Sequence, residues 1–273
     1  MITESFEFEG IPINCHRAGG GPALLLLHGS GPGASSVGNW QPVLPALAER
    51  FDIYAMDLIG FGKSGRKPAP PYFDYSMWVR QATAMLNRIP QERVGVIAHS
   101  LSASVGLTMA AAHSRVAGVM TTGAMGASFP LQPGTIRTWT CPQNRQQLVE
   151  ALSGLIHDTS RIDEAYLQAR EQVILAPGYA DYFDEMFEGD RQKYINAAIL
   201  PDDTLARVQC PVLMLHGRED GSFPPSSSQQ IASKLKRVDF MLLSDCSHSV
   251  AAERTGTFLA LANEFFDELL NNK

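Results

Sequence analysis

Short apolar runs alternate with amphipathic stretches along both ends of this chain of 273 residues. The runs have the length of strands, and the stretches between them repeat apolar residues with the helical period. Strand-like runs lie at 23–28, 51–57, 94–100, 116–124, 211–217 and 238–244, after an N-terminal hairpin at 5–8 and 11–17. Helical patterns occupy 39–50, 75–89, 101–113, 226–237 and 255–270. This alternation predicts an α/β fold, with helices flanking a mostly parallel sheet.

The middle of the chain, from about 128 to 208, has a different pattern. It contains no strand-like run, only amphipathic helical stretches such as NRQQLVEALSGLIHD and IDEAYLQAREQVI, interrupted by Pro-Gly pairs at 133 and 177. An insertion of this length between two core strands would cover the carboxyl ends of the sheet, where open α/β sheets bind ligands. We therefore predict a core of residues 1–127 and 209–273 and a helical lid of residues 128–208.

Charge and composition exclude several classes of function. The net charge of −6 leaves no basic surface of the kind that binds nucleic acid. No apolar run is long enough to span a bilayer, and the N-terminus lacks the pattern of a signal peptide. The four scattered cysteines are typical of reduced thiols, and the pair Cys246 and His248 lacks the further ligands of a zinc site. We expect a cytoplasmic protein that binds neither nucleic acid nor membrane and uses no metal ion or cofactor.

Ser100 stands between the strand-like run 94–100 and a helical pattern rich in small residues. The order strand, serine, helix is typical of a nucleophile elbow, which needs small residues two positions before and after the serine. Here these residues are Ala98 and Ser102, which are small but are not glycine. A serine at this place is also typical of a helix N-cap. Ser100 therefore needs partners elsewhere in the chain to be interpreted as a nucleophile.

A nucleophilic serine requires a histidine that takes its proton and a carboxylate that fixes the tautomer of that histidine. In the α/β-hydrolase fold these residues follow in the order serine, acid, histidine, each at the carboxyl end of a strand. Asp220 in HGREDGSFPP and His248 in SDCSHSV fit that order, so we predict a catalytic triad of Ser100, Asp220 and His248. Glu219 and Asp245 are alternative acids in the same two loops. We interpret four other histidines as structural: His16, His113, His157 and His216.

The glycine-rich stretch HGSGPGA, residues 28–34, follows the strand-like run 23–28. We assign the oxyanion hole, two backbone N–H groups that face developing negative charge, to Ser30 and Leu101. The same stretch matches G-x-G-x-x-A, with Asp57 at the end of the next strand, so a dinucleotide site is an alternative. Pro32 and a polar segment delay the next helix to Asn39, which counts against that alternative.

With these residues in view, the chain resembles the meta-cleavage-product hydrolases, which break carbon–carbon bonds in aromatic ring degradation. The resemblance rests on LLLLHGSGPGA with Asn39 and Trp40, AMDLIGFGKS at 55–64, GASFPLQPG, LIHDTSRID, YLQAREQV, HGRED and SDCSH. It implies a serine hydrolase that cleaves a 2-hydroxy-6-oxo-dienoate to a 2-hydroxydienoate and a small acid. The implied partner is a small acidic substrate, and a homodimer is one compatible assembly.

The resemblance also implies substrate-binding residues, namely Gly29, Asn39, Arg170 and Ser249. Arg170 stands where the lid arginine of the family contacts the carboxylate end of the substrate, which a planar guanidinium can bind through two hydrogen bonds. Asn39 stands where the family has its active-site asparagine. Ser249 replaces a tryptophan, and the elbow departs from Gly-Asn-Ser-x-Gly at Ala98, His99 and Ser102. These departures lie in the predicted site and bear on the choice of substrate.

Other functions stay open on the sequence. A carboxylesterase or an enol-lactone hydrolase would use the same triad, because acyl transfer needs the same groups. A ligand sensor without activity and a cofactor-independent oxygenase are more distant alternatives on this fold. The presence of all three residue types in the correct order argues against the sensor.

Overall fold

A computed structural model describes residues 1–271, apart from the side chain of Arg161. Within these residues, eight strands form one sheet in the order β1-β2-β4-β3-β5-β6-β7-β8. The strands are β1 (Ile2–Phe8), β2 (Ile11–Ala18), β3 (Ala23–Leu27), β4 (Asp52–Met56), β5 (Val94–His99), β6 (Val116–Thr122), β7 (Val212–Gly217) and β8 (Val238–Leu243). β1 and β2 pair antiparallel with their neighbours, and β3 to β8 are parallel. The predicted α/β fold with a mostly parallel sheet is confirmed.

The sheet has a hydrophobic core on each face. In β3, Leu24 and Leu26 belong to one cluster of buried side chains, and Leu25 and Leu27 belong to the other. Successive residues of a strand point to opposite faces. An unbroken leucine run is therefore typical of a strand with helices on both sides.

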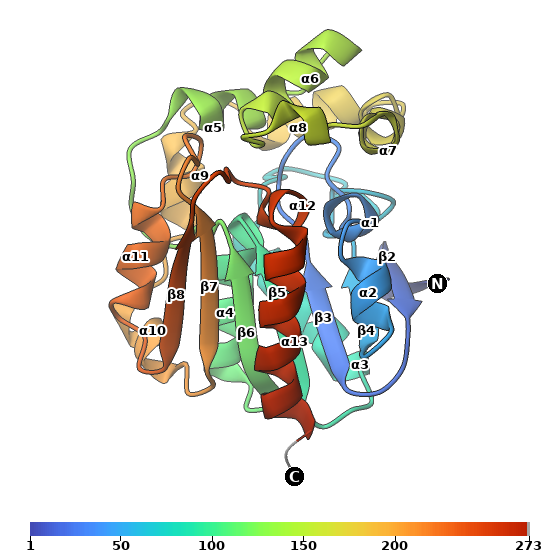
Figure 1. Cartoon of the computed structure of the whole chain (residues 1–273). Coiled ribbons are helices and arrows are strands. Elements are labelled where there is room, and N and C mark those ends of the chain that lie inside the picture. Colours follow the sequence, from blue (N-terminus) through green and yellow to red (C-terminus); the bar gives the residue numbers. More distant parts are fainter. Residues whose placement is uncertain (272–273) are drawn as a thin grey trace.

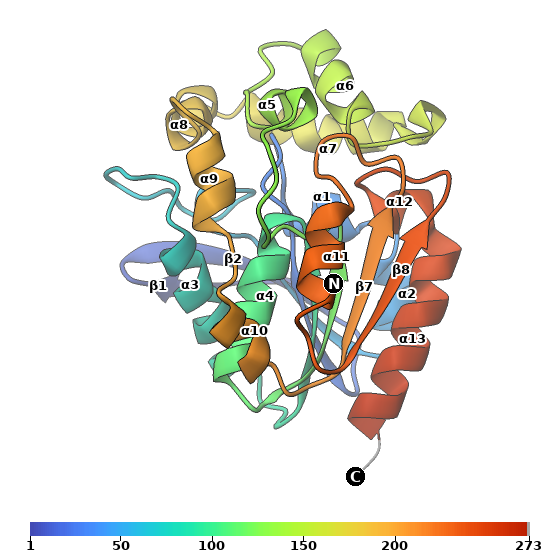
Figure 2. The same cartoon turned by 90° about the vertical axis from the view of Figure 1, so that its left-hand side faces the viewer.

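Two groups of helices cover the two faces (Figures 1 and 2). One face carries α3 (Tyr75–Arg88), α4 (Leu101–Ala112) and α11 (Ser226–Ala232), and the other carries α2 (Leu44–Ala48) and α13 (Thr255–Asn271), which follows the short α12 (Val250–Glu253). The single helix predicted at 39–50 is wrong, because α1 (Ser36–Trp40) and α2 are separate. Pro42 lies before α2 and Pro45 lies in its first turn, and neither has an N–H group with which to continue a helix from α1. The helix predicted at 226–237 ends early, at Ala232.

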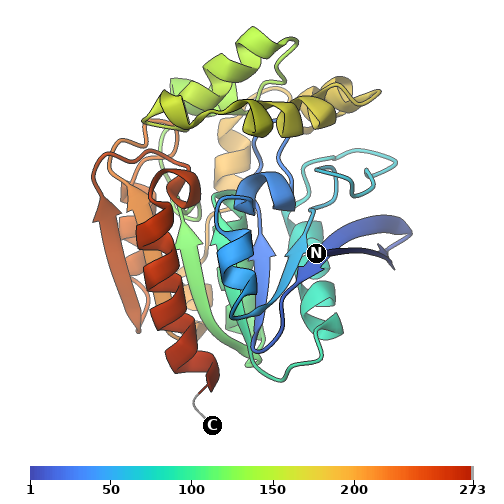
Figure 3. The ribbon, with the colours of Figure 1, turned by 45° about the vertical axis from the view of Figure 1, so that its right-hand side comes forward.

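The insertion between β6 and β7 contains only helices and loops in its described part. Its helices are α5 (Pro133–Thr138), α6 (Arg145–Ser153), η1 (Thr159–Arg161), α7 (Glu164–Ile174), α8 (Tyr179–Met186), α9 (Gln192–Ala197) and α10 (Asp202–Arg207). Helices α5 to α8 lie across the carboxyl ends of the strands (Figures 1 and 3), whereas α10 lies beside α4 on the core (Figure 2). The part of the insertion that covers the sheet thus ends before α10.

Aromatic rings join these covering helices to the core. Trp139, after α5, stacks on Phe187, after α8, with ring centroids 5.0 Å apart and planes 9° apart. Phe183 of α8 meets Phe61 of the core edge to face at 6.3 Å. These side chains are buried, and such pairs stabilise by more than the area that they bury. No helix within residues 1–271 has the length and apolar character needed to cross a membrane.

Candidate active site

Ser100 occupies the sharp turn between β5 and α4. Its backbone has φ 59° and ψ −124°, a conformation that costs strain in a residue other than glycine. The Ser100 N–H donates to the carbonyl oxygen of Thr122 at 2.9 Å, so β6 holds the turn. The loop after β3 approaches closely, because a Cβ atom on Gly29 would lie 3.1 Å from Ser100 Cβ and 2.9 Å from His99 Cδ2. The strained turn therefore presents the Ser100 side chain at the carboxyl edge of the sheet.

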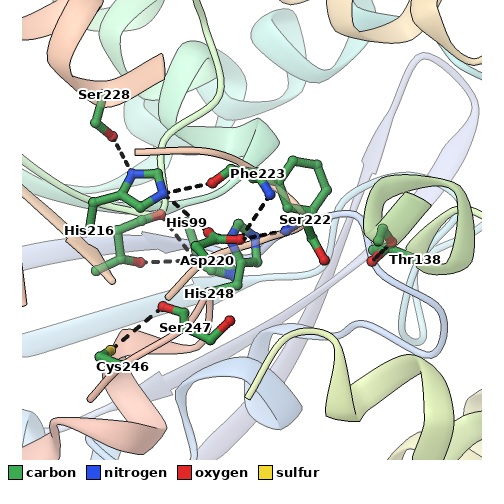
Figure 4. Close-up of polar contacts among 12 residues, drawn as sticks. His99, Thr138, His216, Asp220, Ser222, Phe223, Ser228, Cys246, Ser247 and His248 are labelled. Carbon is green, nitrogen blue, oxygen red and sulfur yellow. Dashed lines mark hydrogen bonds and ion pairs between the residues drawn. The ribbon is translucent and has the colours of Figure 1, made fainter. Parts of the chain in front are cut away.

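Asp220 and His248 form a buried pair. Asp220 follows β7 and His248 follows β8, and His248 Nδ1 lies 2.6 Å from Asp220 Oδ2 (Figure 4). Asp220 Oδ1 accepts hydrogen bonds from the backbone N–H groups of Ser222 and Phe223, at 3.1 and 2.8 Å. Burial raises the pKa of the Asp220 carboxyl, but His248 and the hydrogen bonds from His216 and His248 outweigh it and hold the pKa below its usual range. Asp220 is thus an ionised carboxylate that fixes His248.

The two alternative acids lie elsewhere. Glu219 accepts a hydrogen bond from the Cys246 N–H at 3.1 Å, and Asp245 is exposed, with φ 52°. In the described part of the chain, neither carboxylate contacts His248. The sequence placed three acids in two loops, and the fold brings only Asp220 to the histidine.

His216, interpreted from the sequence as structural, lies on the same carboxylate. Its Nε2 is 3.1 Å from Asp220 Oδ2, its Nδ1 is 2.7 Å from Ser228 Oγ, and the side chain is completely buried (Figure 4). This contact between His216 and Asp220 was not predicted from the sequence. The spacing of four residues between His216 and Asp220 was the available signal. It is a weak signal, because the direction of the Asp220 side chain depends on the path of the loop after β7.

Ser100 and His248 line one small cavity beneath the lid, together with Ser30, Asn39 and Arg170. The cavity measures about 20 Å³, room for roughly one water molecule. Among the described residues, no hydrogen bond joins Ser100 Oγ to His248. Such contacts are often loose without substrate and tighten in the reacting complex. The two groups share the cavity but are not yet bonded.

His99 lines the same cavity and packs against His248. Its ring centroid lies 4.6 Å from that of His248, and its Nδ1 lies 3.1 Å from the Thr122 carbonyl oxygen and 2.9 Å from Thr122 Oγ1. A carbonyl oxygen only accepts, so Nδ1 carries the hydrogen. Burial, and then the neighbouring His248, hold the pKa of His99 well below its usual value. His99 is therefore a neutral side chain beside Ser100.

The loop after β3 carries the predicted oxyanion hole. Ser30 lines the cavity, and Leu101 is the first residue of α4, where an N–H group has no acceptor within its own helix. In residues 1–271 neither of these two N–H groups donates a hydrogen bond to the protein. Trp139 Nε1 donates to Ser30 Oγ at 3.2 Å, so the lid holds this loop in place. Both N–H groups remain free to donate to a ligand.

Asp57, the acid required by the dinucleotide alternative, is fully engaged inside the core. Its Oδ1 accepts from the Ser36 N–H at 2.6 Å, and its Oδ2 accepts from Asn14 Nδ2 and the Lys63 N–H at 2.8 and 2.9 Å. Its exposed fraction is 1%. A carboxylate with these partners cannot also bind a ribose, so the dinucleotide alternative is wrong.

Arg170 of α7 points inward and is only 6% exposed. One guanidinium nitrogen donates to the Pro32 carbonyl oxygen at 2.8 Å, and the other donates to Tyr166 Oη at 3.0 Å. Its Nε is buried without a hydrogen-bond partner. Asn39 and Ser249 line the same cavity, as does Gly29. The structure thus brings the four predicted substrate-binding residues around the cavity that Ser100 lines.

The pair Cys246 and His248 does not form part of a metal centre in the described residues. Burial raises the pKa of the Cys246 thiol to about 12, and His248 Nδ1 is bound to Asp220. Within residues 1–271, no group of three histidine, cysteine, aspartate or glutamate side chains is arranged to hold a metal ion. All four cysteines are free thiols.

The chain is similar in sequence to hydrolases of dienoate-type substrates, by their names. It is 28% identical over 260 residues to 2-hydroxymuconate semialdehyde hydrolase of Pseudomonas sp. (strain CF600), covering 95% of this chain and 92% of that protein. It is also 28% identical to 2-hydroxy-6-oxo-2,4-heptadienoate hydrolase of Pseudomonas putida (strain F1), over 94% of this chain and 93% of the other.

Solved structures show the same relationship. A meta-cleavage product hydrolase from Pseudomonas fluorescens IP01 superposes with a TM-score of 0.91 at 28% identity, covering 97% of both chains. The 2-hydroxy-6-oxo-6-phenylhexa-2,4-dienoate hydrolase of Rhodococcus sp. strain RHA1 gives 0.86 at 27% identity, over 97% of this chain and 98% of the other. The model of the α/β-hydrolase fold family matches residues 22–255. This chain is a member of the α/β-hydrolase fold family.

Proposed function

We propose that this protein is a serine hydrolase that cleaves a carbon–carbon bond of a 2-hydroxy-6-oxo-dienoate. Ser100 is the nucleophile, His248 the general base and Asp220 the acid that orients it. The observation that carries the proposal is the strained turn at Ser100, which shares a cavity with a histidine bound to a buried carboxylate. The similarity to hydrolases of meta-cleavage products over nearly the whole chain supports this choice of substrate.

The chemistry follows from these positions. The dienol form of the substrate takes up a proton on carbon and becomes a ketone. The Ser100 hydroxyl, or a water that His248 deprotonates, then adds to the distal carbonyl carbon. The backbone N–H groups of Ser30 and Leu101 stabilise the oxyanion. The carbon–carbon bond breaks, and its electron pair leaves with the dienoate, which takes up a proton. If water added directly, its oxygen becomes part of the small acid. If Ser100 added, the acyl group stays on Ser100 Oγ as an ester, and a water activated by His248 then hydrolyses this ester, which releases the small acid and restores the serine. Water supplies the atoms that balance the reaction.

The lid binds the acidic end of the substrate. The Arg170 guanidinium, whose Nε is buried without a partner, provides charge-assisted hydrogen bonds to a carboxylate. The cavity of about 20 Å³ is too small for a dienoate, so substrate entry requires the cavity to widen. The free thiols support the expectation of a reducing, cytoplasmic setting.

A substrate panel tests the proposal. Purified enzyme should remove the dienolate absorbance of 2-hydroxymuconate semialdehyde, and the variant Ser100→Ala should not. A series of short p-nitrophenyl esters and enol lactones tests the alternative. A kcat/KM for esters that exceeds the value for every dienoate would make this protein an esterase.

A further inference from the structure

Asp220 Oδ2 lies against two histidines from different loops. His248 Nδ1 is 2.6 Å away, and His216 Nε2 is 3.1 Å away (Figure 4). Oδ1 accepts from the Ser222 and Phe223 N–H groups. The carboxylate is thus held by four donors, two on each oxygen. Of the two histidines, His248 is the general base of the mechanism given above, whereas His216 has no role in it.

The contacts of His216 decide which nitrogen carries its hydrogen. Its Nε2 faces two acceptors, Asp220 Oδ2 and the Phe223 carbonyl oxygen at 2.9 Å, so Nε2 is the donor. Its Nδ1 lies 2.7 Å from Ser228 Oγ, whose hydroxyl can donate to that nitrogen. The side chain has no exposed surface. Ser228 and Phe223 therefore fix His216 as a hydrogen-bond donor to the carboxylate.

We propose that His216 is a positioning residue, which holds the Asp220 carboxylate in place and weakens its attraction for protonated His248. A hydrogen bond to Oδ2 draws negative charge away from the oxygen that faces His248. The imidazolium is then stabilised less, so more of His248 is the neutral base at a given pH. The inference rests on the proposed triad and adds to it a fourth side chain, in the order His216, Asp220, His248 and Ser100.

Removing His216 should move the acid limb of the pH profile. Without its hydrogen bond, Asp220 Oδ2 attracts the imidazolium form of His248 more strongly, and the acid limb of kcat/KM shifts to higher pH. The titratable and charged groups that face His248 are Asp220 from the loop after β7, His99 from β5 and Arg170 from α7. Burial holds the pKa of His99 well below its usual value, so this side chain is not the source of the limb.

The experiment measures kcat/KM from pH 5 to 9 for the wild type, His216→Leu and His216→Gln. The leucine variant should shift the limb upward by about half a pH unit or more and lower the plateau about tenfold. The glutamine amide can donate near the position of Nε2, so this variant should recover most of the shift. His16→Leu removes a buried histidine of β2 far from the site and controls for lost stability.

Two outcomes would overturn the proposal. In the first, His216→Leu lowers activity at every pH without moving the limb, which makes the residue structural only. In the second, ¹⁵N NMR of histidine-labelled wild type shows a neutral His216 with its hydrogen on Nδ1, a result that does not depend on any variant folding. Asp220→Asn separates this failure from failure of the triad, because a fully active Asp220→Asn would remove the proposed function itself.

Discussion

The two sides of the cavity around Ser100 differ in how completely their polar groups are bonded. On the core side, Asp220 accepts four hydrogen bonds and His248 is held through Nδ1. On the lid side, Arg170 buries an Nε atom without a hydrogen-bond partner. The Asp220 carboxylate, which we propose to orient the base, is fully bonded, because its geometry must exist before substrate arrives. On the lid side, the fold leaves a hydrogen-bond donor without an acceptor, and a bound ligand can supply this acceptor.

Loss of the nucleophile should give the largest effect, since no other group on the core side can replace it. Ser100→Ala should lower kcat on a dienoate by about 10³-fold or more, while the unfolding temperature stays near that of the wild type. Single-turnover kinetics and a thermal melt measure the two quantities. Activity within tenfold of the wild type in a folded variant would place the nucleophile elsewhere.

Asp220→Asn should disrupt the interaction between residue 220 and His248 without changing the size or shape of the side chain at position 220. The amide does not hold His248 in the correct tautomer, so kcat/KM should fall by about 10²- to 10³-fold. The matched control is Asp245→Asn, in the exposed turn before His248, which should remain within about twofold of the wild type. Comparable losses in the two variants would contradict the assignment of Asp220.

Arg170→Ala tests the lid side by itself. If the guanidinium binds a carboxylate, its loss removes about 1.5 to 3 kcal/mol, or roughly ten- to a hundredfold in kcat/KM on a dienoate. A neutral p-nitrophenyl ester has no carboxylate, so its kcat/KM should change by less than about threefold.

The control for Arg170→Ala is Arg145→Ala, which removes the two ion pairs that Arg145 of α6 forms with Glu164 and Glu171 of α7. It should leave both substrates nearly unchanged, because exposed pairs contribute little. Equal losses on dienoate and ester in Arg170→Ala would mean that Arg170 only supports the lid, and the esterase alternative would then be favoured.

The smallest effect concerns His99, which lies in the wall of the cavity. Its pKa is lowered in the folded protein, so below about pH 6.5 the unfolded chain binds a proton that the folded one does not. Its contribution is present above that pH and is lost as the pH falls. The free energy of unfolding should therefore decrease from pH 7.5 to 5. His99→Asn should make that decrease shallower, by at most about 1.4 kcal/mol per pH unit.

Urea denaturation at several pH values measures this slope. Some slope should remain in the variant, because the pKa values of His16 and His28 are also lowered by burial. Between pH 7.5 and 8.5 the His99 contribution is constant, and that range serves as the internal control. An unchanged slope between pH 6.5 and 5 would show that His99 is protonated in the folded protein.

Local patterns were enough to predict the sheet and the residues at its edge. Parallel strands end at one edge, so residues that follow them in the order serine, acid, histidine are expected to meet there. The wrong helix prediction at 39–50 also has a local cause. Pro42 and Pro45 break the helix predicted at 39–50, and their missing N–H groups were visible in the sequence.

By itself, the sequence determined the fold class, the chain order of Ser100, Asp220 and His248, and the position of a helical insertion over the strand ends. Only the tertiary structure decided which acid meets His248, that His216 shares its carboxylate, and that Arg170 turns inward. The physical reason is that periodicity and chain order fix where a backbone segment lies. The partner of a side chain depends on loop paths and on the packing of distant segments, and no local pattern encodes these.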